Sequence, residues 1–212
     1  MTTDQKNEEL NKIAEEIKNF KGLDIARNAT HAVPGEGNPD ATLFFCGEGP
    51  GFNEDQQGRP FVGQAGKLLE KTLKEILNLD RVDVYITNII KFRPPDNRDP
   101  QPFEIEACRN WLDRQIDIIR PKIICTLGRF SMAKFIPDVS ISRVHGQPRF
   151  VEFLGQKYII FPMYHPAAAL RGTTVLNEFK QDFVKLKNML NPVSVQPNIP
   201  EEKPVITQPS LF

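Results

Sequence analysis

TLFFCGEGPGFNEDQQGRPFVGQAGKLLEKTLKEIL, residues 42–77, begins with a short apolar run and ends with a helical pattern. The run at 42–46 is typical of a buried strand, and the apolar spacing over about 64–77 is typical of an amphipathic helix. The connection between them is rich in glycine and carries three carboxylates. Ligands in open α/β sheets bind at the carboxyl ends of strands, so this loop predicts a site, although an ordinary long connection has a similar composition.

The rest of the chain repeats this alternation of strand and helix. Strand-like runs lie at 83–90, at 122–127, and at 148–164, the last as two neighbouring strands joined at Gly155. Helical patterns lie at 4–20, at about 64–77, at 103–119 and at about 176–190. Strands separated by helices of this length predict an α/β fold with a mainly parallel sheet covered on both faces.

Length and composition bound the domain organisation and the partners. The 212 residues are expected to form one domain, 1–190, and a disordered tail, 191–212, because the tail holds five prolines and almost no apolar periodicity. Lys plus Arg equals Asp plus Glu at 27 each, so bulk charge indicates no partner and any DNA surface is a local basic patch. No run is apolar enough for a membrane span or a signal peptide, so a cytoplasmic location is expected.

Polar loops follow two further predicted strands. TNIIKFRPPDNR occupies 87–98 and YHPAAALRG occupies 164–172. Each loop taken alone resembles an ordinary turn. Because the carboxyl ends of parallel strands meet at one edge of a sheet, the three loops together predict a cleft.

Three long motifs occur in a characteristic order: GEGPGFNEDQQGRPFVGQAGKLL, VYITNIIKFRPPDNRDP and FPMYHPAAALR. In order and spacing they resemble the motifs of family 4 uracil-DNA glycosylases, and the likeness extends from about Val33 to about Leu190. The resemblance implies a three-layer α/β/α fold and a monomer. It also implies hydrolysis of the N-glycosidic bond of deoxyuridine in DNA, which leaves an abasic site and initiates base excision repair.

The resemblance assigns roles to the residues of a base pocket. A glycosylase flips its base out of the duplex and reads the Watson–Crick edge. Phe61 would stack on the uracil, and Asn88 would pair with its N3–H and O4. His165 would stabilise the departing uracil anion at O2 as a neutral donor. The remaining substrate-binding positions are Gly47 and Gly49. Glycine at 49 and at 51 would let backbone N–H groups approach a phosphate, because no Cβ stands in the way.

Two carboxylates of the first loop, Glu48 and Glu54, are the predicted catalytic pair that faces the cationic sugar and orients the attacking water. Glu54 is the preferred candidate for water activation, and its neighbour Asp55 is a further possibility. The alternative is that these carboxylates cap the loop and form a salt bridge with Arg59.

The same loops are expected to hold DNA. The candidates come from two segments: the basic stretch KFRPPDNR and the segment after the His-Pro turn. The second segment resembles the wedge that fills the gap left by an extruded nucleotide. The candidates are Lys91, Arg93, Arg98, Ala168, Leu170 and Arg171. For each basic residue taken separately, the alternative is an ordinary solvated surface charge.

The cysteines depart from the family pattern. Most members are expected to hold a [4Fe–4S] cluster with four cysteines, of which two lie near the N-terminus and one lies in a KCRPP motif. This chain has KFRPP with Phe92 at that position, and its first cysteine is Cys46. Only Cys108 matches a ligand position, and one thiolate cannot hold four irons. We therefore predict no cluster and no other metal or cofactor, with packing around Phe92 taking over the structural role.

Two other functions are considered beside the glycosylase. One is a damage-binding protein of the same fold that has lost catalysis. The other is covalent capture of the sugar by a histidine, for which His145 is the spare candidate. The presence of Glu48, Phe61, Asn88 and His165 together favours the active glycosylase, because a binder needs no complete catalytic set.

The last five residues, QPSLF, resemble the Q-x-x-L-F peptides that dock on bacterial-type sliding clamps. Gln208, Leu211 and Phe212 are the predicted contacts: two apolar side chains would enter an apolar groove, and the glutamine would add a hydrogen bond. A ragged terminus with chance hydrophobic residues is the alternative.

Overall fold

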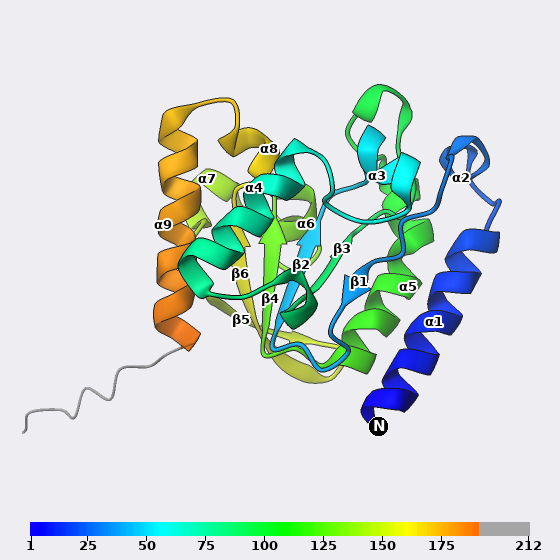
Figure 1. Ribbon diagram of the computed structural model, residues 1–212, viewed down its shortest axis with the longest axis horizontal. Coiled ribbons are helices and arrows are strands. Elements are labelled where there is room, and N and C mark those ends of the chain that lie inside the picture. Colours follow the sequence, from blue (N-terminus) through cyan, green and yellow to red (C-terminus); the bar gives the residue numbers. More distant parts are fainter. Residues whose placement is uncertain (191–212) are drawn as a thin grey trace, which may run out of the picture.

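The computed structural model describes residues 1–190, and its centre is a six-stranded sheet with the order β1-β3-β2-β4-β6-β5. The strands are β1 (Glu36–Gly37), β2 (Leu43–Gly47), β3 (Tyr85–Asn88), β4 (Ile123–Leu127), β5 (Arg149–Phe153) and β6 (Gln156–Met163). The four inner strands pair in parallel, and β1 and β5 pair antiparallel at the two edges. The predicted α/β fold with a mainly parallel central sheet is confirmed (Figure 1).

Helices cover both faces of this sheet (Figure 1). They are α1 (Thr3–Asn19), α2 (Asp24–Asn28), α3 (Phe52–Gln57), α4 (Gln64–Thr72), α5 (Pro102–Ile119), α6 (Arg129–Ala133), α7 (Ile141–Val144), α8 (Pro166–Ala169) and α9 (Thr173–Leu190). A π-helical turn, Leu73–Leu77, extends α4. Within residues 1–190 no helix has the length and apolar character needed to cross a lipid bilayer.

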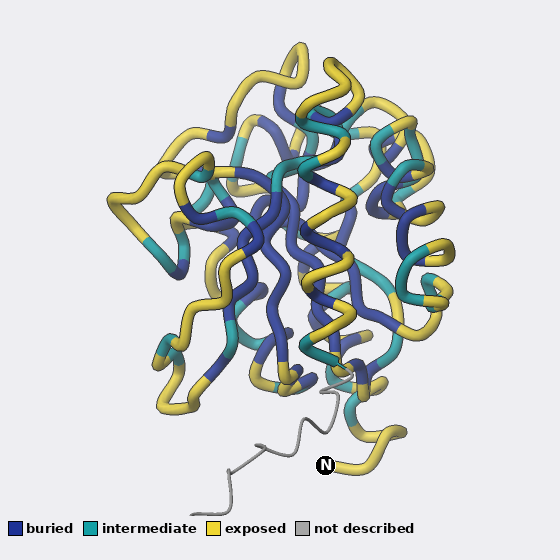
Figure 2. Tube along the Cα trace, turned by 90° about the vertical axis from the view of Figure 1, so that its left-hand side faces the viewer, coloured by how far each residue is buried: buried dark blue, intermediate teal, exposed yellow. Residues whose placement is uncertain are grey.

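The alternating side chains of the strands divide the core into two halves. Phe44 of β2 packs in the half that α1 and α5 cover, whereas Phe45 packs in the half that α4 and α9 cover. Both rings are fully buried, which stabilises the fold by roughly 1.5–3 kcal/mol for each side chain. The buried strands run between exposed outer helix faces, so the architecture is the expected three-layer sandwich (Figure 2).

The structure differs from the sequence-based expectation around the second loop of the sheet edge and at the edge strand β1. The predicted strand 83–90 is shorter, because β3 ends at Asn88. The next two residues no longer belong to the strand, although Ile89 N still donates to the Gly47 carbonyl at 3.0 Å and Ile90 N donates to the Glu48 carbonyl at 3.2 Å. The short edge strand β1 was not predicted. Its Gly37 has φ 131° and a Cβ there would lie 1.9 Å from the carbonyl oxygen of Val84, so only glycine fits this close pairing.

Candidate active site

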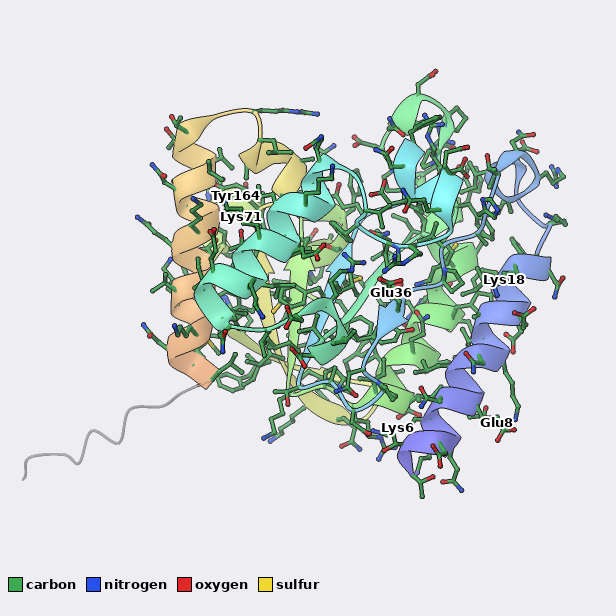
Figure 3. All side chains as sticks on the ribbon, viewed as in Figure 1. Lys6, Glu8, Lys18, Glu36, Lys71 and Tyr164 are labelled. Carbon is green, nitrogen blue, oxygen red and sulfur yellow. The ribbon has the colours of Figure 1, made fainter. Side chains whose placement is uncertain are left out.

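A cavity of about 570 Å³ lies at the carboxyl ends of β2, β3 and β6, where the three polar loops meet. Its wall includes six of the residues predicted as catalytic or substrate-binding: Glu48, Gly49, Glu54, Phe61, Asn88 and His165. The last loop begins at Tyr164, which also lines the cavity and is labelled in Figure 3. The expected cleft is therefore present, and parallel strand order is what brings these distant segments together.

Phe61 forms one wall of the cavity in a backbone conformation that few phenylalanines adopt. Its φ is 51°, in the left-handed region, and its ring lies 5.6 Å from the His165 ring at an interplanar angle of 30°. Gly47 makes room for this ring, because a Cβ at position 47 would lie 2.4 Å from both Phe61 Cζ and Asn88 Oδ1. The absence of a side chain at Gly47 keeps the aromatic face and the amide in one pocket.

Asn88 is the last residue of β3 and lies beside Gly47 in the sheet register. Its side chain is 1% exposed, and Oδ1 is buried without a hydrogen-bond partner among the described residues. An unsatisfied buried acceptor costs about 1–3 kcal/mol, so native proteins rarely keep one without a functional reason. Asn88 Oδ1 therefore points to a ligand that brings a hydrogen-bond donor into the pocket.

His165 is the N-cap residue of α8, and its Nδ1 accepts a hydrogen bond from the Ala167 backbone N–H at 3.1 Å. This contact fixes the tautomer, because a neutral imidazole that accepts at Nδ1 carries its proton on Nε2. Burial lowers the pKa of His165 to about 4. The ring is thus a neutral hydrogen-bond donor near pH 7. This is the protonation state that the predicted role of His165 requires.

Glu48 follows β2 directly and contacts the first turn of α6, which begins shortly after β4. Its Oε1 accepts from the Phe130 backbone N–H at 3.0 Å. Gly128 permits this approach, since its φ is 100° and a Cβ there would lie 2.4 Å from the same carboxylate oxygen. Burial raises the pKa of Glu48, and the N–H of Phe130 and the charge of Arg129 partly oppose that rise. A carboxylate with one backbone donor keeps capacity to accept a further hydrogen bond from a ligand.

Glu54 is bound much more tightly to its own loop. Its Oε2 accepts from Gly51 N at 3.1 Å, and its Oε1 accepts from Val62 N at 2.8 Å and Gly63 N at 2.7 Å. These bonds close the segment that carries Phe61, which suits the loop-capping alternative. The salt bridge with Arg59 that was considered for these carboxylates does not form, because Arg59 pairs with Glu36 instead.

Comparison with known proteins decides the family. The family model described as "Uracil DNA glycosylase superfamily" matches residues 34–190. A type-4 uracil-DNA glycosylase from Sulfurisphaera tokodaii is 49% identical over 85% of this chain and 84% of its own length. The corresponding proteins of Saccharolobus solfataricus and Archaeoglobus fulgidus are each 46% identical, over 86% and 84% of this chain and 87% and 92% of their own lengths.

The chain belongs to the type-4 uracil-DNA glycosylases. The family resemblance inferred from the three motifs is thereby confirmed.

One predicted DNA contact of this glycosylase is wrong. Lys91 is 0% exposed, and its Nζ donates to Thr87 Oγ1 at 2.6 Å, to the Asn88 carbonyl at 2.8 Å and to Gln115 Oε1 at 2.9 Å. The prediction grouped Lys91 with the arginines that follow it in the sequence. The chain turns inward after β3, so Ile90, Lys91 and Phe92 are all buried and the side chain cannot reach a phosphate.

Of the other predicted DNA contacts of the glycosylase, all but Arg93 and Leu170 line the cavity. Arg93 stacks its guanidinium 5.3 Å from the centre of the exposed Phe52 ring, and Arg98 makes two hydrogen bonds to Glu104. Ala168 and Arg171 line the cavity, and Leu170 between them is 51% exposed. An exposed leucine beside an arginine at this rim has the character of the predicted wedge.

Arg81, which no sequence motif indicates, supports the aromatic wall of the glycosylase pocket. Its guanidinium donates to the carbonyl oxygens of Pro60 at 2.6 Å and Phe61 at 2.9 Å. It also pairs with Glu36 on β1, labelled in Figure 3, which in turn binds Arg59. No local pattern indicates this role, because in sequence Arg81 resembles any surface charge next to a turn.

His145, considered for covalent capture of the sugar, is engaged elsewhere. Its Nδ1 lies 2.8 Å from Asp182 Oδ2, and its ring packs 4.4 Å from that of Tyr164. Its side chain is not among those that line the cavity in the described part of the chain. Nothing in this arrangement favours His145 as a nucleophile in the pocket.

The cysteines do not fit the iron–sulfur cluster that family 4 enzymes usually carry. Cys46 and Cys125 lie in β2 and β4 in opposite halves of the core, and Cys108 lies in α5. Burial raises the pKa of each thiol, which disfavours the thiolate that binds iron. Within residues 1–190 no group of three His, Cys, Asp or Glu side chains could hold a metal ion. A four-cysteine cluster therefore has no matching donor set here.

An aromatic cluster occupies the neighbourhood of the KFRPP motif. The Phe92 ring stacks on Phe20 at 6.0 Å and meets Trp111 edge to face at 6.5 Å. Phe20 and Trp111 also contact each other edge to face at 5.0 Å. The three rings join the segment after α1, the loop after β3, and α5, so apolar packing links these parts of the chain.

Proposed function

We propose that the protein is a uracil-DNA glycosylase that hydrolyses the N-glycosidic bond of deoxyuridine in DNA. The observation that carries this proposal is the unpartnered acceptor Asn88 Oδ1, buried in a cavity that also holds the Phe61 ring. Uracil offers the N3–H donor that this acceptor lacks, and its O4 can accept from the amide nitrogen. Cytosine reverses that donor and acceptor pattern and would leave buried groups unpaired. Cleavage leaves an abasic site, the first product of base excision repair.

His165 stabilises the leaving uracil in this proposal. Bond cleavage places negative charge on the base, and the Nε2–H of a neutral imidazole donates to uracil O2 as that charge develops. The bond from Ala167 N–H holds the ring in the required tautomer before substrate arrives. A preorganised donor in a buried site avoids the reorganisation that water would need, which is why such groups contribute strongly to catalysis.

Glu48 is the carboxylate that faces the cationic sugar and orients water. The structure supports Glu48 over the earlier preference for Glu54, because Glu54 already accepts three backbone N–H groups. Glu48 accepts one backbone N–H, and it lies next to Gly47 at the base pocket. Glu54 then acts on the reaction by holding the loop that carries Phe61.

The test of the function is a single-turnover excision assay on oligonucleotides that contain one uracil or one cytosine at the same position. The native protein should excise uracil and leave cytosine intact. Asn88→Ala should slow uracil excision strongly. It should also narrow the difference in excision rate between uracil and cytosine, because the amide that reads the Watson–Crick edge of the base is absent. Retention of an intact, reversibly bound oligonucleotide by the native protein would instead indicate a damage-binding protein.

The two carboxylates give a second prediction. Glu48→Gln should lower the rate of uracil excision about a hundredfold or more with little change in thermal stability, because the loss is one of charge at the reaction centre. Glu54→Gln should lower the melting temperature, because a neutral amide is a poorer acceptor for three N–H groups and brings a donor among them. If Glu48→Gln kept near-native rates while Glu54→Gln lost them without melting earlier, the two roles would be reversed.

We further propose that Gln208, Leu211 and Phe212 dock on a sliding clamp. These residues lie outside the described part of the chain, so the support is the resemblance of QPSLF to clamp-binding peptides. Deleting residues 208–212 should abolish an affinity that we expect to be roughly micromolar, as is usual for short peptides that order on docking. Calorimetry with a purified clamp measures the affinity, and excision from naked oligonucleotides should be unchanged. Equal affinity of the full and truncated chains would exclude the motif.

A further inference from the structure

Lys91 is a buried amine whose hydrogen-bond partners are all neutral. Its Nζ contacts a threonine hydroxyl, the Asn88 backbone carbonyl and a glutamine carbonyl oxygen, at 2.6–2.9 Å. A buried lysine is ordinarily paired with a carboxylate, because an unpaired cation in a protein interior is costly. A methionine of similar length would fill the same space without that cost, so the amine has no evident packing purpose.

The groups around Lys91 leave its charge without a counterion in the described structure. Cys46 of β2, Cys108 of α5 and Lys134 are the titratable groups that influence it, and Tyr85 of β3 lies beyond Gln115. Burial raises the pKa values of both thiols and of the tyrosine, so these groups are neutral near pH 7. Lys134 contributes charge of the same sign.

The position of the amine relative to the base pocket is set by the end of β3. Thr87 faces the half of the core that contains Gln115, and the next residue, Asn88, turns its amide towards the cavity. Lys91 lies behind this strand end and binds the backbone oxygen of Asn88. One residue therefore separates a buried cation from the space that receives the base.

We propose that Lys91 is a positioning residue that fixes Asn88 through its backbone oxygen and supplies a buried positive charge favouring the uracil anion. This inference rests on the proposed glycosylase function and assigns a new role within it. A unit charge acts over several ångströms in a protein interior, where screening is weak. The effect grows as negative charge develops on the base, so it lowers the barrier more than it strengthens ground-state binding.

The test uses two leaving groups and a charge-removing variant. Single-turnover excision of uracil and of 5-fluorouracil, from otherwise identical oligonucleotides, is compared between the native protein and Lys91→Met at a pH where both bases are neutral. Fluorine stabilises the departing anion by itself, so it reduces the need for protein charge. We expect Lys91→Met to slow uracil excision about ten- to thirtyfold. The factor by which it slows 5-fluorouracil excision should be several times smaller.

Gln115→Leu is the matched control, because it disturbs the same hydrogen-bond network and keeps the lysine. At a pH well below the pKa of Lys91, where the variant also keeps the charge, it should slow the excision of both bases by the same factor. An equal loss on both bases in Lys91→Met as well would overturn the inference, since it would show a role in local structure alone. A native protein that excises neither base would contradict the proposed function itself, so the two failures are distinguishable.

A second measurement serves if Lys91→Met does not fold. Burial lowers the pKa of Lys91 to about 8, so native uracil excision should fall as the pH rises through that value and the amine loses its charge. Gln115→Leu removes an acceptor of the protonated amine and should move this midpoint to lower pH. A midpoint at the same pH in both proteins would rule out Lys91 as its source.

Discussion

His165→Ala is expected to slow single-turnover excision of uracil about 10²- to 10³-fold, the usual effect of removing a donor that stabilises developing negative charge. The structure gives the reason, since burial and the Ala167 N–H hold this imidazole neutral with its proton on Nε2. His31→Ala is the matched control, because His31 is exposed and does not line the cavity. Rates near those of the native protein for His165→Ala would remove the residue from the mechanism.

The pH dependence of folding provides an independent check on His165. Its pKa is about 4 in the folded protein and about 6.5 when unperturbed, so between these values the unfolded chain binds a proton that the folded chain does not. The free energy of unfolding should therefore be fully maintained above about pH 6.5 and decrease as the pH falls towards 4. Denaturant titrations across this range should show a weaker decrease for His165→Ala than for the native protein.

Phe92→Ala is expected to lower the free energy of unfolding by about 3–5 kcal/mol, the usual cost of truncating a buried aromatic ring. The ring is buried among Phe20 and Trp111, and its removal leaves a cavity between α1 and α5. Phe103→Ala is the matched control: its ring is 57% exposed and should contribute within about 0.5 kcal/mol. Equal stability of the two variants, measured by urea titration, would show that the aromatic cluster does not hold the fold together.

The missing cluster cysteines, one of them replaced by Phe92, predict that the protein contains no iron–sulfur cluster. Protein purified without oxygen should be colourless and contain no stoichiometric iron, because one cysteine matches the four ligand positions of the family. About four irons per chain would contradict this prediction.

Sequence patterns located the elements of the site well because those elements depend on local chemistry. The apolar runs around Phe44 and Ile124 identify strands, and polar loops after strands identify the edge where a pocket forms. Contacts between distant segments were not accessible in the same way. Arg81 holds the carbonyl of Phe61 twenty residues away, and nothing near either residue indicates the other.

The direction in which a side chain points could also not be predicted from the sequence. Lys91 and Arg93 are neighbours in a basic segment, yet Lys91 points into the core and Arg93 stacks on an exposed ring. The outcome depends on how the chain turns after Asn88, which is determined by packing against α5 and the segment around Pro34. For Glu54 the sequence supplied both a catalytic and a capping interpretation, and only the positions of three N–H groups separate them.

The unpaired oxygen of Asn88 also bears on turnover. An acceptor that is uncompensated in the empty pocket favours any occupant with a suitable donor, and the excised base keeps its N3–H after the bond to the sugar is broken. Under the proposed function, free uracil would bind the same acceptor, and its departure would restore the uncompensated state. The oxygen proposed to select the substrate would therefore also hold the excised base.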